Sequence, residues 1–177
     1  NLPIFYIVQK NIEPISMVLL NNAQKSWGID DYIEFYSCQG NLLYKDIISF
    51  CKKHSITGLD FLNLIGVVGG RLYKKVKEGK LDYDLDKNKD DLNEKLFVIN
   101  QVKKLLSEKL TGEKRFLNSS FLRRALSFLL GLEAFNRDVF IEKLKLNIDK
   151  FYPCTSVHSY IKMIKGVYNT RNQNPID

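Results

Sequence analysis

Residues 92–110 read LNEKLFVINQVKKLLSEKL, and this stretch indicates the fold class. Its apolar residues return at the spacing of an amphipathic helix, so that one stripe would face a core. Thr111 and Gly112 then end the pattern, as turn-forming residues do after a helix. A helix of this length needs other elements to cover its stripe, which consists of Leu92, Leu96, Ile99, Leu106 and Leu110.

Three more helices are predicted after this stretch. Asn118 or Ser119 would open the first, Asn136 the second, and Thr155 or Ser156 the third. The side-chain oxygens of these residue types accept hydrogen bonds from the free amides of a first helical turn. The second helix is expected to carry Phe140, Leu144, Ile148 and Phe151 inward and to stop at Pro153.

The first half of the chain also has helical spacing. A helix is predicted from Glu13 to about Ala23, a second begins near Ile29 and ends at Gly40, and a third covers residues 41–54. Thr57 would cap a helix over 59–67, since a threonine hydroxyl satisfies orphan amides.

Two short segments follow that helix. A basic helix is predicted over 71–77, and Gly79 begins a polar, acidic connector that extends through Lys89.

Residues 2–8, Leu-Pro-Ile-Phe-Tyr-Ile-Val, predict one strand, because aromatic and β-branched residues favour extended backbone. A single strand cannot stand alone and must pair with another. The sequence therefore predicts a mainly α protein, an irregular bundle of about seven or eight short helices with one N-terminal strand.

Composition favours a folded chain in a reducing cytoplasm. The 177 residues are 45% hydrophobic, which suffices for a core, and no apolar run approaches the roughly 18 to 20 residues that span a bilayer. Three widely spaced cysteines indicate neither disulfides nor a paired-cysteine zinc site. His54 and His158 lack neighbours at metal-ligand spacing. We expect no catalytic site, no metal, no cofactor and no membrane partner.

The net charge of +7 and the pI near 9.2 favour a polyanionic partner such as nucleic acid. Basic residues gather in 71–80 and again in 103–124, and the stretch between them, 82–94, is acidic. These blocks of opposite sign either neutralise one another or leave a true binding surface.

Residues 44–66 have the outline of a helix-turn-helix, with the turn at residues 54–56. In that motif the second helix would present Thr57, Asp60 and Asn63 to the major groove; because it is mostly apolar and Asp60 would repel phosphates, the sequence favours a plain helical hairpin over a groove reader. The expected phosphate-contacting residues are Lys52, Lys53, Arg71, Lys74, Lys75, Lys77, Arg123 and Arg124. Arg123 and Arg124 are expected at a solvent edge, as phosphate contacts or as solubilising charge.

Residues 20–27, LNNAQKSW, with Asp30-Asp31-Tyr32-Ile33 and then residues 40–44, GNLLY, resemble the ParB-like proteins of phages and mobile elements. Val167-Tyr168-Asn169 with Arg171 resembles their C-terminal helix. The resemblance implies that residues 1–28 end an upstream ParB-like core, that the strand is the last of this truncated α/β core, and that residues 29–177 form a helical domain.

The same resemblance implies weak nucleotide-binding roles for two residues. Asn22 occupies the position of an asparagine that binds nucleotide in ParB, and Lys25 occupies the position of an arginine. Lysine lacks the bidentate grip of arginine, and Asn21 stands where ParB carries glutamate.

Three functions follow as predictions. The first is a DNA-associated helical module of a ParB-like protein, which binds mainly through phosphates and is not an enzyme as it stands. The second is a protein-interaction regulator encoded by a phage or mobile element, and the third is a fragment of a nucleotide-binding ParB-like switch.

Overall fold

The computed structural model describes residue 16 and residues 27–65, 70–109 and 115–176, with the backbone alone at residues 70, 71 and 115. These residues form helices and no strand, which confirms the prediction of a mainly α protein. The α-helices are α2 (Ile29–Cys38), α3 (Leu42–His54), α4 (Gly58–Leu64), α5 (Gly70–Lys77), α6 (Leu85–Lys109), α7 (Ser120–Leu130), α8 (Arg137–Leu146) and α9 (Val157–Asn169); the 3-10 turns are η1 (Arg115–Asn118) and η2 (Ile148–Lys150).

Three predictions concern residues outside this description. The strand over 2–8, the helix from Glu13 to Ala23 and the upstream core over 1–28 all fall on residues that are described only at 16, 27 and 28.

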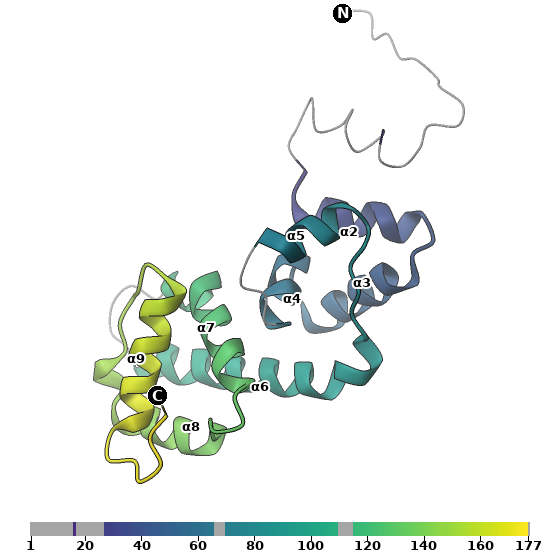
Figure 1. Cartoon of the computed structure of the whole chain (residues 1–177). Helices are drawn as coiled ribbons and strands as arrows, with labels where there is room; N and C mark the ends of the chain where they lie inside the picture. The colour runs from purple at the N-terminus through teal and green to yellow at the C-terminus, as the bar shows by residue number, and fades with distance from the viewer. Residues whose placement is uncertain (1–15, 17–26, 66–69, 110–114, 177) are drawn as a thin grey trace, which may run out of the picture.

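The helices form two groups joined by α6 (Figure 1). The N-terminal group, α2 to α5, lies at one end, and the C-terminal group, α7 to α9, lies at the other. The 25-residue helix α6 runs from beneath the N-terminal group into the C-terminal group; it contacts α3 and α4 of the first and α7 and α8 of the second. Helix α4 also packs directly against α7, so two connections hold the groups together.

The core follows the predicted stripe of α6. Leu92, Leu96, Ile99 and Leu106 are all buried, as their spacing indicated. Helix α6 begins earlier than predicted, however, because the carboxylate of Asp84 accepts a hydrogen bond from the amide of Lys87 (2.9 Å) and so caps a first turn inside the expected connector.

The predicted caps are confirmed at four helices. Thr57 Oγ1 accepts from the amide of Asp60 (3.1 Å), Ser119 Oγ from Phe121 (3.2 Å), Asn136 Oδ1 from Asp138 (3.0 Å), and Ser156 Oγ from Ser159 (3.1 Å). Local sequence thus fixes where α4, α7, α8 and α9 begin.

Helix α8 ends at Leu146 rather than continuing to Phe151. Its C-cap Asn147 leaves helical geometry, and the amide side chain of Asn147 donates to the carbonyl of Lys143 (2.9 Å). The turn η2 then carries the chain to Phe151, which is buried.

One tyrosine ties the N-terminal group together. Tyr44 on α3 is fully buried, its hydroxyl donates to the carbonyl of Val76 (3.2 Å), and it accepts from the amide of Leu81 (3.4 Å). The hydroxyl therefore fixes the end of α5 and the following connector against α3.

No helix among the described residues is both long and apolar enough to cross a membrane.

Candidate nucleic-acid interface

The predicted lysines of the N-terminal group lie on two different helices. Lys52 and Lys53 occupy the last turn of α3, and Lys74, Lys75 and Lys77 lie on α5; all five are exposed. The side chain of Arg71 lies outside the described part of the structure, as do Asn22 and Lys25.

Nearby acidic and aromatic groups engage part of this charge. Glu78 lies 3.8 Å from Lys74 and 3.5 Å from Lys80, measured between nitrogen and oxygen. The amine of Lys77 lies over the ring of Tyr32, 5.8 Å from its centroid. Exposed pairs of this kind stabilise little, so these amines are still open to a stronger anionic partner.

Helix α2 packs against both α3 and α5 and adds opposite charge beside them. Its exposed carboxylates are Asp30, Asp31 and Glu34. Residues 27–84 contain eight Lys and Arg residues and eight Asp and Glu residues, so the N-terminal group as a whole is neutral. Six of these eight acidic residues lie outside the acidic stretch 82–94, so the balance comes mainly from other segments.

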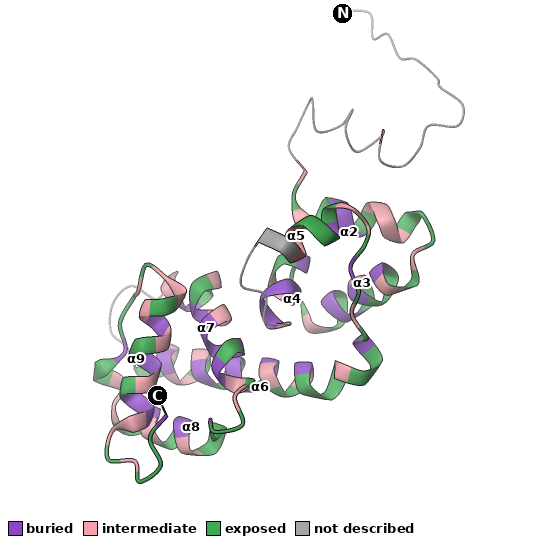
Figure 2. Cartoon of the chain, viewed as in Figure 1, coloured by how far each residue is buried: buried purple, intermediate pink, exposed green. Residues whose placement is uncertain are grey.

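Helix α4 does not present the side chains that a recognition helix would use. Asn63 is only 2% exposed, Asp60 is largely covered, and Phe61, Leu62 and Leu64 are buried. Figure 2 shows α4 buried along most of its length, and this helix is the part of the N-terminal group that packs against α7. The outline of a helix-turn-helix is thus the plain helical hairpin that the sequence favours, and the alternative in which α4 offers Asp60 and Asn63 to a groove is wrong.

The expectation that Arg123 lies at a solvent edge is also wrong. Its guanidinium forms an ion pair with the carboxylate of Asp60, and only 11% of the Arg123 side chain is exposed. Arg124 is half-buried, and its Nε is buried without a hydrogen-bond partner among the described residues. Burial of Arg123 follows from α7 packing against α4, which no local pattern reveals.

The excess of positive charge lies instead in the C-terminal group. Residues 115–176 contain ten Lys and Arg residues against four Asp and Glu residues. This imbalance is visible in the sequence when charge is counted over a whole segment, whereas a search for dense local runs misses it. The residues missed in that way are Lys143, Lys150, Lys162 and Arg171, and we call them the C-terminal basic cluster.

Hydrogen bonds gather most of this cluster at the end of α9. The amine of Lys143 on α8 donates to the carbonyl of Arg171 (3.0 Å), and the amine of Lys150 in η2 donates to Thr170 Oγ1 (3.4 Å). Thr170 in turn donates to the carbonyl of Gly166 (2.9 Å). Lys162 is exposed one turn before Gly166 on the same helical face.

The cluster also has a structural explanation. The last carbonyls of a helix lack intrahelical donors and carry partial negative charge, so nearby lysines stabilise the end of α9. This role engages the amines of Lys143 and Lys150 and leaves the exposed Lys162 and Arg171 unexplained.

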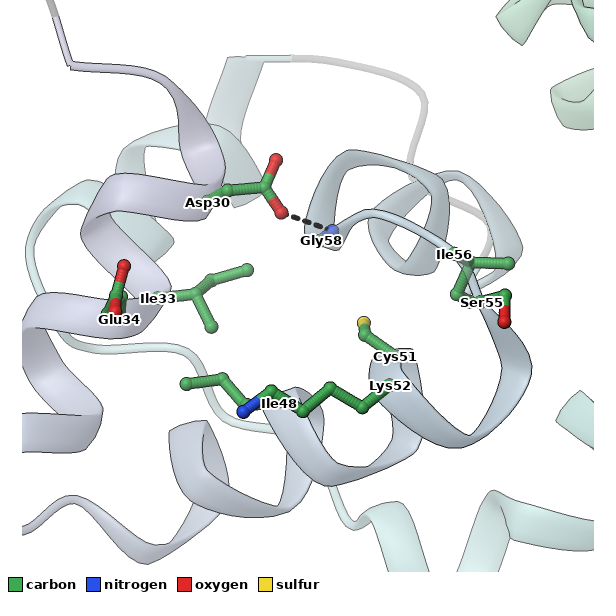
Figure 3. Close-up of a pocket in the computed structure, with 9 residues that line it drawn as sticks. All are labelled: Asp30, Ile33, Glu34, Ile48, Cys51, Lys52, Ser55, Ile56 and Gly58. Atoms are coloured by element: carbon green, nitrogen blue, oxygen red, sulfur yellow. Dashed lines mark hydrogen bonds between the residues drawn. The ribbon is translucent and has the colours of Figure 1, made fainter.

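A second feature is a pocket of about 350 Å³ between α2, α3 and the start of α4 (Figure 3). Ile33, Ile48 and Ile56 give it apolar walls, and the thiol of Cys51 points into it. The carboxylate of Asp30 accepts a hydrogen bond from the amide of Gly58 (2.6 Å) at one edge.

The chemistry of this pocket does not favour a nucleophile. Burial first, and then the charge of Asp30, raise the pKa of the Cys51 thiol to about 12, so it stays protonated at neutral pH. Burial lowers the pKa of His54, whose ring is tilted by 40° against that of Phe50 at a centroid distance of 4.4 Å. Across the described ranges, no three His, Cys, Asp or Glu side chains are grouped so that they could hold a metal ion.

Comparisons of the chain with protein-family models, with curated proteins and with solved structures found no match.

Proposed function

We propose that the protein binds nucleic acid through phosphate contacts made by the C-terminal basic cluster. The observation that carries this proposal is the excess of ten basic over four acidic residues in 115–176, with Lys143, Lys150 and Arg171 drawn together at the end of α9. When lysines and arginines neutralise the phosphates of a nucleic acid, the counterions condensed on the phosphates are released. This release supplies most of the free energy of sequence-independent binding.

Binding of this kind positions nucleic acid but does not read its bases. The burial of α4 supports that distinction, because its Asp60 and Asn63 are not available to base edges. The lysine-rich face of α5, with Lys74, Lys75 and Lys77 exposed, is the second contact surface in this proposal. Lysine suits the role since it acts as a point charge rather than a bidentate fork.

The cellular setting that we propose is a DNA-associated module of a ParB-like protein in the cytoplasm. Its support is the resemblance of residues 20–44 and 167–171, together with the basic charge. Within that proposal the chain contributes affinity for DNA.

The test is fluorescence anisotropy of a labelled duplex of arbitrary sequence, titrated with the full chain at increasing salt. With about four phosphate contacts, affinity falls on the order of 100-fold between roughly 50 and 200 mM salt. Two duplexes of unrelated sequence are expected to bind equally. Absence of binding at the lowest salt contradicts the proposal and favours the protein-interaction alternative.

A further inference from the structure

A groove runs between α6 and α8 on the C-terminal side of the molecule. It consists of two hollows of about 550 Å³ and about 430 Å³. Both hollows are lined by Phe97, Gln101 and Ile141, so they form one continuous depression, which we call the α6–α8 groove.

Phe97 stands at the middle of this groove and is 61% exposed. Its neighbours on α6, Leu96 and Val98, are both buried in the core. A phenylalanine left in water forgoes most of the transfer free energy of its side chain, and a partner that covers the groove would recover it.

The two ends of the groove carry opposite charge. At one end lie Glu94 and Asp138, with Arg137 between them as the partner of both. Lys104 and Lys145 lie at the other end, with Glu108 at 4.0 Å from Lys104. The first end therefore has an excess of one negative charge and the second an excess of one positive charge.

The opposite charges at the two ends of the groove are complementary to a second copy of the same groove in reversed orientation. In a twofold dimer the same patch meets itself, and when the axis is perpendicular to α6 the two copies of α6 run in opposite directions. The acidic end of one copy then faces the basic end of the other, and the two Phe97 side chains meet near the axis. A parallel arrangement would instead set like charges against each other at both ends.

We propose that the α6–α8 groove is the interface of an antiparallel homodimer. This inference goes beyond the proposed nucleic-acid binding and does not depend on it, since the groove and the C-terminal basic cluster share no residue. The part of α6 that lines the groove, from Asn93 to Glu108, is about 22 Å long at 1.5 Å a residue. A contact along one helix segment of this length is short, so we expect a weak dimer that forms at micromolar concentrations.

Sedimentation velocity of the full chain, from low to high micromolar concentration, tests the dimer directly. The wild-type protein is expected to shift from monomer to dimer, and Phe97→Glu is expected to stay monomeric. Leu42→Glu is the matched control, because Leu42 is 72% exposed on α3, in the other helical group, and should leave the dimer intact. A wild-type protein that stays monomeric throughout, or a Phe97→Glu variant that dimerises like the wild type, overturns the proposal.

Charge exchange tests the antiparallel arrangement. Glu94→Lys alone or Lys104→Glu alone places like charges opposite each other, so each is expected to weaken dimerisation several-fold. The double variant restores opposite charges only if residue 94 faces residue 104 of the second copy, and it should recover wild-type affinity. A double variant as weak as the single ones contradicts the antiparallel arrangement, while circular dichroism confirms that all variants keep their helices.

Discussion

The guanidinium of Arg123 on α7 pairs with the carboxylate of Asp60 on α4, and this ion pair joins the two helical groups. Only 11% and 18% of the two side chains are exposed. The buried amide of Asn63 and the buried hydroxyl of Ser127 lie one turn further along the same helices. The packing of α4 on α7 therefore includes buried polar groups beside this ion pair.

Arg123→Ala is expected to lower the free energy of unfolding by about 2–4 kcal/mol, because it leaves the Asp60 carboxylate largely buried without its partner. Urea denaturation followed by circular dichroism measures the change. The control is Lys74→Ala, which breaks the exposed pair with Glu78 outside the α6–α8 groove and should cost about 1 kcal/mol or less. Equal losses in the two variants would show that the Asp60 pair is not structural.

Gly58→Ala is expected to destabilise the fold by about 1–3 kcal/mol, although alanine normally favours a helix. A Cβ at Gly58 would lie against the Cδ1 atom of Ile33 and 2.9 Å from the carboxylate of Asp30. Gly166→Ala on α9 is the control, since nothing lies within 4 Å of its Cβ position. That variant should raise the thermal unfolding temperature, whereas a Gly58→Ala protein as stable as the wild type would refute the close packing of α2 and α4.

Stability is expected to fall between about pH 9 and about pH 12. Burial raises the pKa of Cys51 from 9.0, and those of Tyr44 and Tyr83 from 10.0, to about 12. The unfolded chain loses these protons first and binds fewer of them across that interval, so the free energy of unfolding decreases as pH rises. Urea titrations at successive pH values measure the slope.

The Cys51→Ala variant isolates one group in that pH dependence. The thiol has the lowest ordinary pKa of the three groups, 9.0 against 10.0 for the tyrosines. Without it, the decline in the free energy of unfolding should begin nearer pH 10 than pH 9. If the free energy of unfolding of the variant depends on pH as that of the wild type does, the Cys51 thiol ionises as readily in the folded chain as in the unfolded one.

Much of the fold could be predicted because its signals are local. The stripe of α6 and the caps at Thr57, Ser119, Asn136 and Ser156 depend on residues within a few positions of one another. The start of α6 differs from the prediction because Asp84 lies within an acidic stretch. Aspartate is common both at the start of a helix and in a polar connector, so the sequence does not distinguish the two.

The candidate site could not be predicted in the same way because it depends on tertiary packing. Arg123 has the sequence pattern of surface charge, and only the packing of α7 on α4 sets it beside Asp60, which neutralises it. Lys143, Lys150 and Arg171 come from three different segments, and none of these is a basic run. Only the fold brings them together.

Charge reversal tests the functional account most directly. The measurement is the dissociation constant of a labelled duplex, at one low salt concentration, for Lys150→Glu/Arg171→Glu and for Lys52→Glu/Lys53→Glu. Both double variants change the net charge equally, but only the first alters the C-terminal basic cluster. The account predicts a loss on the order of 100-fold in the first variant and a much smaller loss in the second; equal losses, or a larger loss in the Lys52→Glu/Lys53→Glu protein, would contradict it.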